Sequence, residues 1–417
     1  MIFSPTLRST RRPILRLPAI ALAIAGLWLA VLPAPAAASS SPEEFARTLS
    51  GKERRLFEEY LSAQALHDFK MDAYWREVSD KRALRRGKRK RKQPFALDDY
   101  VRTLPPEYNG PSLSSSLQKR WAAFQAKDKP KDKPSSSTST LPTVEDYLAM
   151  AKSVYGFRPD RVSEREFKRR YAREALAAGL TPDQVVRVYA LETGGLGTAD
   201  MVAGIHPIRK TGTPISTAIG YAQLLVANTT DELTKYGGGF LDRLDNMAAQ
   251  PGISDTRRAA LRDKRKRLAA MISAVRSIPH QWSHHQRFSR TRKGRAIHAI
   301  NIDGDIGPWL QVVKLKGLKK MAANAGRHEM TGAEIELMNL AGPGTGLEMM
   351  QRAGRKVPTS NFFSRAAYYR NTIVRGKTSA ELLVALDDRM EKNMRNSGAV
   401  EFAEVFREVT RGVASNR

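Results

Sequence analysis

The sequence contains no cysteine. This absence excludes disulfide frameworks, thiolate metal sites, a cysteine nucleophile and lipid attachment to an N-terminal cysteine. Acidic residues are also scarce, since 42 Asp and Glu stand against 70 Lys and Arg and leave a net charge of +28. Hydrophobic residues make up 41% of the chain, enough for a folded protein with a sizeable core. The remaining classes are nucleic-acid binders, binders of anionic polymers and enzymes with a basic surface.

Several common signatures are missing as well. No phosphate-binding loop of the Gly-x-x-x-x-Gly-Lys-Ser/Thr type occurs, because the glycine-rich stretch at 342–346 lacks the lysine. The chain shows no alternation of strands and helices and no internal repeat. These absences exclude the usual nucleotide-binding sheets and leave a mostly helical protein.

Residues 1–38 have the order of charge and hydropathy that is typical of an export signal. Arginines precede an apolar stretch at 17–32, and small residues follow in an A-x-A pattern that ends at Ala38. The arginine pair at 11–12 resembles a twin-arginine signal. We therefore expect cleavage and a periplasmic location, which argues against nucleic acid as a partner. If uncleaved, the uncharged stretch would anchor the chain to a membrane.

The rest of the chain divides into three predicted segments. Residues 39–125 are expected to be a helical N-terminal region, because apolar residues recur there at near-helical spacing. The basic run at 82–92 within it would either bind polyanions or form a solvated loop. Residues 126–142, rich in Lys, Asp, Pro, Ser and Thr, predict a disordered linker. Residues 143–417 form the main domain.

Helix-start signals repeat through this main domain. A Ser or Thr followed three residues later by Glu or Gln forms a capping box. Such pairs stand at Ser163 and Glu166, Thr181 and Gln184, Thr229 and Glu232, Thr331 and Glu334, and Thr378 and Glu381. Apolar residues on one face also predict a highly charged helix near 254–276. The fold class that we predict is therefore mostly α.

The strongest candidate for chemistry is Glu192. The helix capped by Thr181 must end near Glu192, because Gly194 and Gly195 follow and glycine is the usual residue after a helix. The helix dipole and apolar neighbours both disfavour a charged carboxylate at that point. Both effects raise the pKa, as a general acid requires at neutral pH. A single glutamate at a helix end is more often exposed and inert, so its neighbours in the sequence decide the interpretation.

Three motifs accompany Glu192. They are ALETGG at 190–195, GYAQLL at 220–225 and NLAGPG at 339–344. In this order they resemble the lytic transglycosylase family, which has a helix-ending Glu-Ser, a Gly-x-x-Gln segment and an Ala-Tyr-Asn-Ala-Gly turn. The resemblance covers roughly residues 180–370. It implies a lysozyme-like catalytic domain within 143–417, with residues 240–330 as a helical insertion.

The first two motifs imply roles for individual residues. Glu192 matches the catalytic acid and base of the family, and Thr193 stands where the family usually has serine. The segment with Gly220, Tyr221 and Gln223 matches the part that binds the sugar, where Gln223 lines the cleft and Gly220 permits a close backbone approach.

The third motif departs from the family pattern. Aligning the glycines puts Asn339 where the family has tyrosine, and aligning Asn339 with the family's asparagine requires one extra residue. Asn339 would bind substrate or stabilise an intermediate. Tyr368 and Tyr369 would either supply the tyrosine near the acid or serve as core aromatics.

The resemblance also implies a mechanism with a single carboxyl group. Ordinary glycosidases use two carboxylates, and no second acidic residue has an obvious partner position. Asp200, Asp303 and Asp305 are the remaining candidates, but their spacing from Glu192 in the sequence matches no known pattern for a second catalytic carboxylate. Glu192 would cleave the bond between N-acetylmuramic acid and N-acetylglucosamine in peptidoglycan glycan strands and give a 1,6-anhydro product. The expected partner is peptidoglycan, and the reaction requires no cofactor.

Two further patterns are interpreted as structural. The spacing of His280, His284 and His285 could suit two zinc ligands on one helix. No acidic residue stands at a sequence position that would identify it as the third ligand. We therefore expect no metal there. Trp282 and Trp309 would either stack on sugar rings or belong to the core.

Three alternative functions remain open. A lysozyme-type hydrolase would use an aspartate to position water, and its products would carry reducing ends. A non-catalytic wall-binding scaffold would keep the fold without the chemistry. A nucleic-acid binder would require that residues 1–38 do not export the chain.

Overall fold

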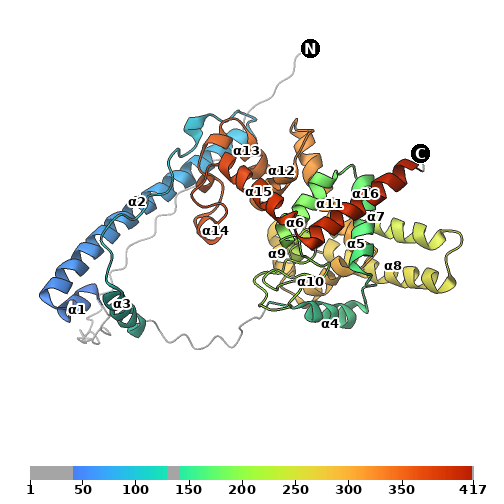
Figure 1. The fold of residues 1–417 in the computed structure, drawn as a ribbon, viewed down its shortest axis with the longest axis horizontal. Coiled ribbons are helices and arrows are strands. Elements are labelled where there is room, and N and C mark those ends of the chain that lie inside the picture. The colour runs from blue at the N-terminus through green and yellow to red at the C-terminus, as the bar shows by residue number, and fades with distance from the viewer. Residues whose placement is uncertain (1–40, 129–140, 416–417) are drawn as a thin grey trace, which may run out of the picture. The chain divides into compact units, whose positions relative to one another are not determined.

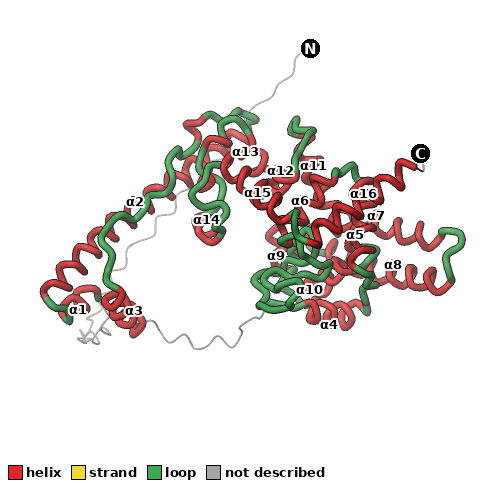
Figure 2. Tube along the Cα trace, viewed as in Figure 1, coloured by secondary structure: helices red, strands yellow, loops and turns green. Residues whose placement is uncertain are grey.

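The computed structural model describes residues 41–128 and 141–415. In this part of the chain sixteen α-helices and four short 3-10 helices are joined by loops, and the only β-structure is isolated bridges (Figure 2). The prediction of a mostly α fold is therefore confirmed. The predicted signal at 1–38 and most of the predicted linker at 126–142 lie outside the described residues. Among the described helices, none has both the length and the apolar character that crossing a membrane requires.

The described chain forms two compact units, with 41–58 and 113–128 in the smaller one and 59–112 and 141–415 in the larger. The smaller unit holds α1 (Pro42–Arg47), the start of α2 (Gly51–Lys90) and α3 (Ser115–Asp128). Its centre is aromatic, because the Phe45 ring lies 5.0 Å from the rings of both Phe57 and Trp121. α3 includes residues 126–128, so the linker does not begin at 126 as predicted: alanine and lysine continue the helix, and the first proline comes only at 130.

The larger unit contains the remaining helices, which Figure 1 colours from blue to red in the order of the chain. The α-helices are α4 (Val144–Tyr155), α5 (Glu164–Ala177), α6 (Pro182–Thr193), α7 (Val226–Ala249), α8 (Asp255–Arg276), α9 (Trp282–Phe288), α10 (Arg292–Ile297), α11 (Ile306–Asn324), α12 (Gly332–Ala341), α13 (Pro343–Met350), α14 (Arg365–Arg370), α15 (Ser379–Asn393) and α16 (Ser397–Ser415). The 3-10 helices are η1 (Leu97–Asp99), η2 (His298–Ile302), η3 (Gly354–Lys356) and η4 (Thr359–Asn361).

Four of the five predicted helix starts are confirmed. Ser163, Thr181, Thr331 and Thr378 are the N-caps of α5, α6, α12 and α15, and each side chain accepts a hydrogen bond from the third residue of its helix. The prediction at Thr229 is wrong, because α7 begins earlier, at Val226. Thr229 is buried inside that helix, and its hydroxyl bonds to the ring of His298 instead of capping a backbone.

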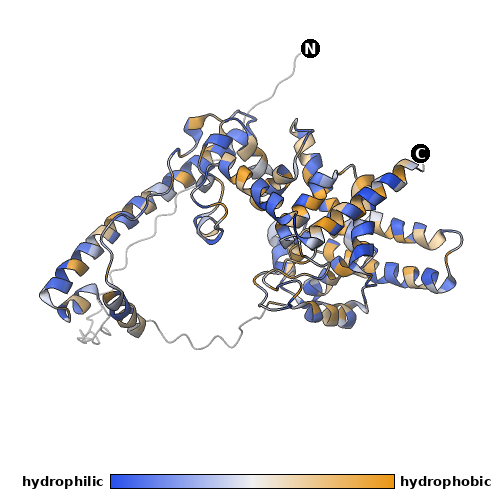
Figure 3. Ribbon diagram, in the orientation of Figure 1, coloured by the Kyte–Doolittle hydropathy of each residue, from blue (hydrophilic) through white to orange (hydrophobic). Residues whose placement is uncertain are grey.

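Two apolar clusters build the core of the larger unit. The first surrounds α6, whose buried Val185, Val188 and Tyr189 face α12, α15 and α16. The second joins α4, α7, α8, η2 and the start of α11. α8 has the predicted apolar face, which packs along α7. Most helices carry apolar residues in stripes beside charged ones, as the banding in Figure 3 shows. α6 is thus held firmly between the helices that follow it in the sequence.

The basic run at 82–92 is the end of α2 and not a loop. Arg85 is 2% exposed and donates hydrogen bonds to Glu348 and to the backbone oxygens of Asp99 and Asn361. Arg82 donates to backbone oxygens of residues 360–363. Part of the run therefore holds α2 against the segment from α13 to η4. Lys88 and Arg89 pair with Asp99 and Glu348, and the remaining basic side chains are exposed.

Candidate active site

The local sequence of α6 determines where Glu192 lies. Thr181 and Gln184 form the capping box that starts the helix, and Pro182 is its first residue. Gly194 ends it in a left-handed conformation with φ 65°. Gly195 also has a positive φ, and a Cβ there would meet the backbone oxygen of Asn393 at 2.2 Å. The helix must therefore end at Thr193, and Glu192 lies in its last turn, as the sequence predicted.

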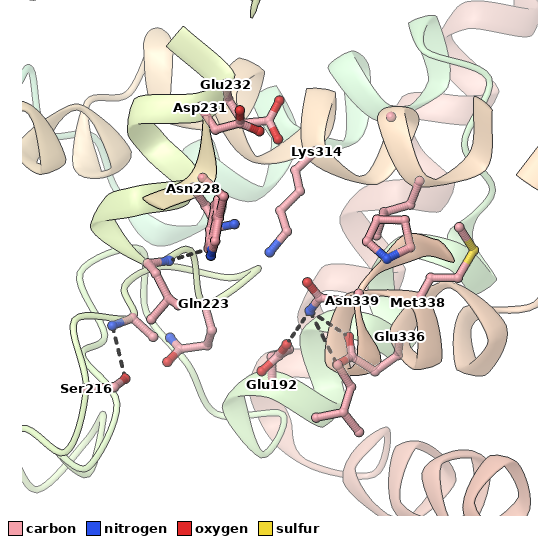
Figure 4. A pocket seen from close by; sticks show the side chains of 18 of the residues that line it. Glu192, Ser216, Gln223, Asn228, Asp231, Glu232, Lys314, Glu336, Met338 and Asn339 are labelled. Carbon is pink, nitrogen blue, oxygen red and sulfur yellow. Dashed lines mark hydrogen bonds between the residues drawn. The ribbon is translucent and has the colours of Figure 1, made fainter. Parts of the chain in front are cut away.

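Glu192 lines a large cavity, with a volume of about 1220 Å³. The walls come from the end of α6, the loop at 201–225, α7, α11, α12 and the start of α13 (Figure 4). Isolated bridges, such as the one between Ile219 and Leu224, hold the loop in shape without a sheet. A cavity of this size can hold an extended ligand, and its lining combines apolar walls with polar side chains that can form hydrogen bonds.

Asn339 connects Glu192 to α12. Its side-chain amide donates a hydrogen bond of 2.8 Å to Glu192 and contacts both carboxylate oxygens of Glu336 at 3.3 Å. The structure thus brings together Glu192 and Asn339, which are far apart in the sequence. This pairing places the third motif at the site, whichever alignment with the family is used.

Glu336 is the acidic neighbour that the sequence analysis missed. It is 4% exposed, and burial together with the adjacent Glu192 raises its pKa well above the usual value. Burial likewise raises the pKa of Glu192, while the charge of Lys314 and hydrogen bonds from Glu336 and Asn339 oppose that rise. Burial and the proximity of the two carboxyl groups therefore disfavour the state in which both are ionised. The signal was available, since Glu336 and Asn339 are three apart on a helix that the Thr331 cap predicted.

Lys314 is one of three lysines that line the cavity, together with Lys235 and Lys320. It extends from α11 toward the carboxyl groups (Figure 4) and forms no ion pair with any described residue. Burial lowers its pKa, and Glu192, Glu336 and Glu232 each oppose that shift. A positive charge among three carboxyl groups keeps the site from accumulating negative charge, and it can also meet an anionic group of a ligand.

Acidic side chains also occupy the wall formed by α7. Asp231 and Glu232 lie at the end of the pocket away from Glu192 in Figure 4. Glu232 is 8% exposed, and burial raises its pKa to about 7. The sequence had assigned Glu232 to a helix cap, which hid its place in the cavity.

The second motif contributes Gln223. This residue lines the cavity with a positive φ of 42°, and its amide donates to the backbone oxygen of Gly220 at 2.7 Å. Gly220 has φ 79°, and a Cβ there would meet the Gln311 amide at 2.7 Å. Gly220 therefore shapes the turn that presents Gln223, but it does not itself line the cavity.

Five predicted site residues, Gly220 among them, do not line the cavity. Thr193 is buried and donates to the backbone of its own helix at Tyr189. Tyr221 points into the core, where its hydroxyl donates to Glu164 at 2.6 Å. Thr193 follows Glu192 directly on α6 and therefore lies on a different face of that helix, whereas Tyr221 belongs to the turn that precedes Gln223.

The tyrosine pair also lies elsewhere. The rings of Tyr368 and Tyr369 pack edge-on against Trp75 of α2, at 5.6 and 6.1 Å. The hydroxyl of Tyr368 accepts a hydrogen bond from the backbone of Gly376. Of the two alternatives given for this pair, the structure favours core aromatics.

The three aspartates named as possible partners are paired elsewhere too. Asp303 and Asp305 are buried around Lys264, and Asp305 also accepts from Arg257. Asp200 pairs with Arg161. These ion pairs are structural, and none of the three residues lines the cavity.

The two tryptophans are divided between the alternatives. Trp282 lines the cavity and is 46% exposed, whereas Trp309 packs in the second core cluster.

Comparison with models of protein families, with curated proteins and with solved structures found no match to this chain. The interpretation of the site therefore depends on its own geometry and on the motifs.

Proposed function

We propose that this protein is a lytic transglycosylase that cleaves the bond between N-acetylmuramic acid and N-acetylglucosamine in peptidoglycan. The observation that carries the proposal is the placement of Glu192, a carboxyl group with a raised pKa at the end of a buried helix, in a cavity large enough for a glycan. Gln223 and Asn339, the two other polar residues matched to the family, line the same cavity. The proposed location is the periplasm, reached through the signal predicted at 1–38.

The proposed reaction uses Glu192 twice. Protonated Glu192 first gives its proton to the glycosidic oxygen, and the bond from that oxygen to the anomeric carbon of muramic acid breaks. The acetamido group of the substrate supports the positive charge that develops. Ionised Glu192 then takes the proton from the 6-hydroxyl group, whose oxygen attacks the anomeric carbon and closes the 1,6-anhydro ring. Glu192 ends the cycle protonated, and no water is consumed.

The neighbours of Glu192 support both of its protonation states. Burial favours retention of the proton before the first step, as an acid needs. Asn339 and Lys314 stabilise the carboxylate after the proton has left. Glu336 lies on the same wall as Glu192 (Figure 4), so it is not placed to act on the opposite face of a sugar ring.

One observation favours a second candidate, hydrolysis. Glu232 is a buried carboxyl group on α7, beyond Lys314 from Glu192 (Figure 4), with a pKa raised to about 7. A carboxylate on that wall could activate water, as the second group of a glycosidase does. Hydrolysis adds water and leaves a reducing end, so the two reactions give different products.

The test is mass spectrometry of the products from purified wall sacculi. The change Glu192→Gln is nearly isosteric, and we expect it to reduce cleavage by about 10²- to 10⁴-fold, the usual contribution of a general acid or base. Glu391→Gln is the matched control, because this glutamate is exposed on α15 and outside the cavity. Anhydromuramic ends support transglycosylation and reducing ends support hydrolysis. Wild-type cleavage by the Glu192→Gln protein would falsify the assignment, and no cleavage by the wild-type protein would favour the scaffold.

A further inference from the structure

Two histidines and an aspartate meet beside the cavity. Asp231 belongs to α7, His280 precedes α9, and His285 lies within α9. Oδ1 of Asp231 lies 3.1 Å from Nε2 of His280 and 3.4 Å from Nδ1 of His285. The three ligand atoms all lie within 4.8 Å of one another. The acidic third ligand, which the sequence near the histidines did not reveal, is Asp231 from a different helix, α7.

His285 is the unusual member of this group. Its side chain is 0% exposed, and neither ring nitrogen has a hydrogen-bond partner among the described residues. Buried imidazoles normally satisfy at least one nitrogen, so an unpartnered ring that faces a carboxylate and a second imidazole needs an explanation. Burial also lowers the pKa of His285, which favours the neutral form with a free lone pair that a metal ion requires.

One carboxylate oxygen of Asp231 remains available to a cation although Lys235 occupies the other. Lys235 pairs with Oδ2 of Asp231, so that Oδ1 is the oxygen turned to the histidines. The rings of His280 and His285 are stacked, with centroids 5.3 Å apart. Asp231 therefore offers one oxygen to Lys235 and keeps the other for the imidazoles.

We propose that Asp231, His280 and His285 bind a divalent transition-metal ion, with Zn²⁺ as the best match. Two imidazoles and one carboxylate are ligands that zinc accepts, and three protein ligands leave a fourth position for water or a ligand atom. Asp231 also lines the cavity, so the metal site lies at its α7 end, away from Glu192 (Figure 4).

The metal would have a structural consequence for the cavity. Trp282 lies between the two histidines in the sequence and lines the cavity with a 46% exposed side chain. Joining α7 to both ends of this segment fixes the position of Trp282. An exposed aromatic ring held at a cavity wall is suited to stacking on a sugar or another flat apolar face. This inference does not depend on the proposed cleavage reaction.

The test is titration of the full, chelator-treated protein with ZnCl₂, followed by calorimetry and thermal denaturation. We expect one site per chain and a rise in Tm on zinc addition, since a ligand of the native state stabilises it. His280→Ala should weaken zinc binding at least about tenfold, and Asp231→Asn should act in the same direction. His280 is 53% exposed, so its loss leaves the fold intact.

His284→Ala is the matched control, because this adjacent histidine is not part of the cluster. It should bind zinc as the wild type does. Co²⁺ in place of zinc gives absorption bands that report nitrogen and oxygen ligands in a tetrahedral site. The proposal is overturned if the wild-type protein shows no saturable zinc binding, or if His280→Ala and His284→Ala bind zinc equally well.

Discussion

At the residue scale, the behaviour of Glu192 depends on the groups that face it. Burial raises its pKa, and Lys314 is the largest influence in the opposite direction. A general acid loses activity as the pH rises through its pKa, so the basic limb of the pH profile reports that value. Burial and the nearby charged groups, Lys314 and Arg389 among them, therefore set the pH range of the proposed reaction.

The first prediction concerns Lys314→Met. Removal of the positive charge should raise the pKa of Glu192 further, so the basic limb of kcat/KM should move to higher pH. Lys320→Met is the matched control, since Lys320 is on the same helix and lines the cavity but is not among the main influences on the pKa of Glu192. The measurement is kcat/KM for soluble glycan between pH 4 and about 9. Equal profiles for both variants would contradict the assigned role.

The second prediction concerns Glu232 and stability. Its pKa is about 7 in the folded protein and 4.5 in the ordinary case, so the carboxyl group stabilises the fold below about pH 4.5 and loses that contribution as the pH rises through 7. The loss amounts to about 3 kcal/mol by the conversion for pKa shifts. Glu232→Gln should therefore reduce the fall in unfolding free energy between pH 5 and pH 8, measured by urea denaturation.

Asp242→Asn supplies the comparison for that measurement. Asp242 is exposed on the same helix, α7. Its replacement should leave the difference in unfolding free energy between the two pH values unchanged. If Glu232→Gln shows the full wild-type difference, Glu232 is not the group that titrates.

At the element scale, the glycines after α6 fix the position of the catalytic candidate. Both Gly194 and Gly195 have a positive φ, but only Gly195 lies against a backbone atom, Asn393 oxygen at 2.2 Å. An L-residue in the left-handed region costs about 1–2 kcal/mol, and a clash with backbone adds to that cost. A methyl group added at Gly194 therefore causes only conformational strain, whereas one added at Gly195 causes strain and a steric clash.

The third prediction follows from that difference. Gly194→Ala should lower the unfolding free energy by about 1 kcal/mol, because only the conformation is strained. Gly195→Ala should cost clearly more and should also reduce cleavage, because the end of α6 must shift with Glu192. Chemical denaturation and product analysis on the same samples test both. Equal stability of the two variants would show that the contact with Asn393 is unimportant.

At the scale of the whole molecule, the large positive charge has more than one use. The sequence suggested a polyanion-binding run or a solvated loop at 82–92. The structure shows that Arg82 and Arg85 are partly or fully buried and hold α2 against residues 348–363. The remaining basic side chains would still attract peptidoglycan, whose peptide stems carry carboxylates.

The fourth prediction compares a buried arginine of the basic run with an exposed one. Arg85→Met should destabilise the protein by about 3 kcal/mol, the lower end for a broken buried pair, because Arg89 still pairs with the buried carboxylate of Glu348. Arg86→Met, at the adjacent exposed position, should change the unfolding free energy by no more than about 0.5 kcal/mol. Denaturation curves give both values. Similar values for the two variants would mean that the contact between Arg85 and Glu348 contributes little.

The sequence by itself determined the helices and the place of Glu192 on one of them. Caps, apolar spacing and terminal glycines act within a few residues, so they predicted α5, α6, α8, α12 and α15 correctly. The same reasoning failed at Thr229, where burial in the core outweighed a local capping pattern.

Only the tertiary structure decided which side chains meet. Asn339 and Glu336 reach Glu192 because α12 packs on α6, and Asp231 reaches His285 because α9 packs on α7. Tyr368 is turned to Trp75 by packing on α2. These contacts join residues far apart in the chain, and their energies arise from burial and charge in three dimensions. No periodicity or local motif encodes such contacts, so the sequence indicated the acid while the fold supplied its surroundings.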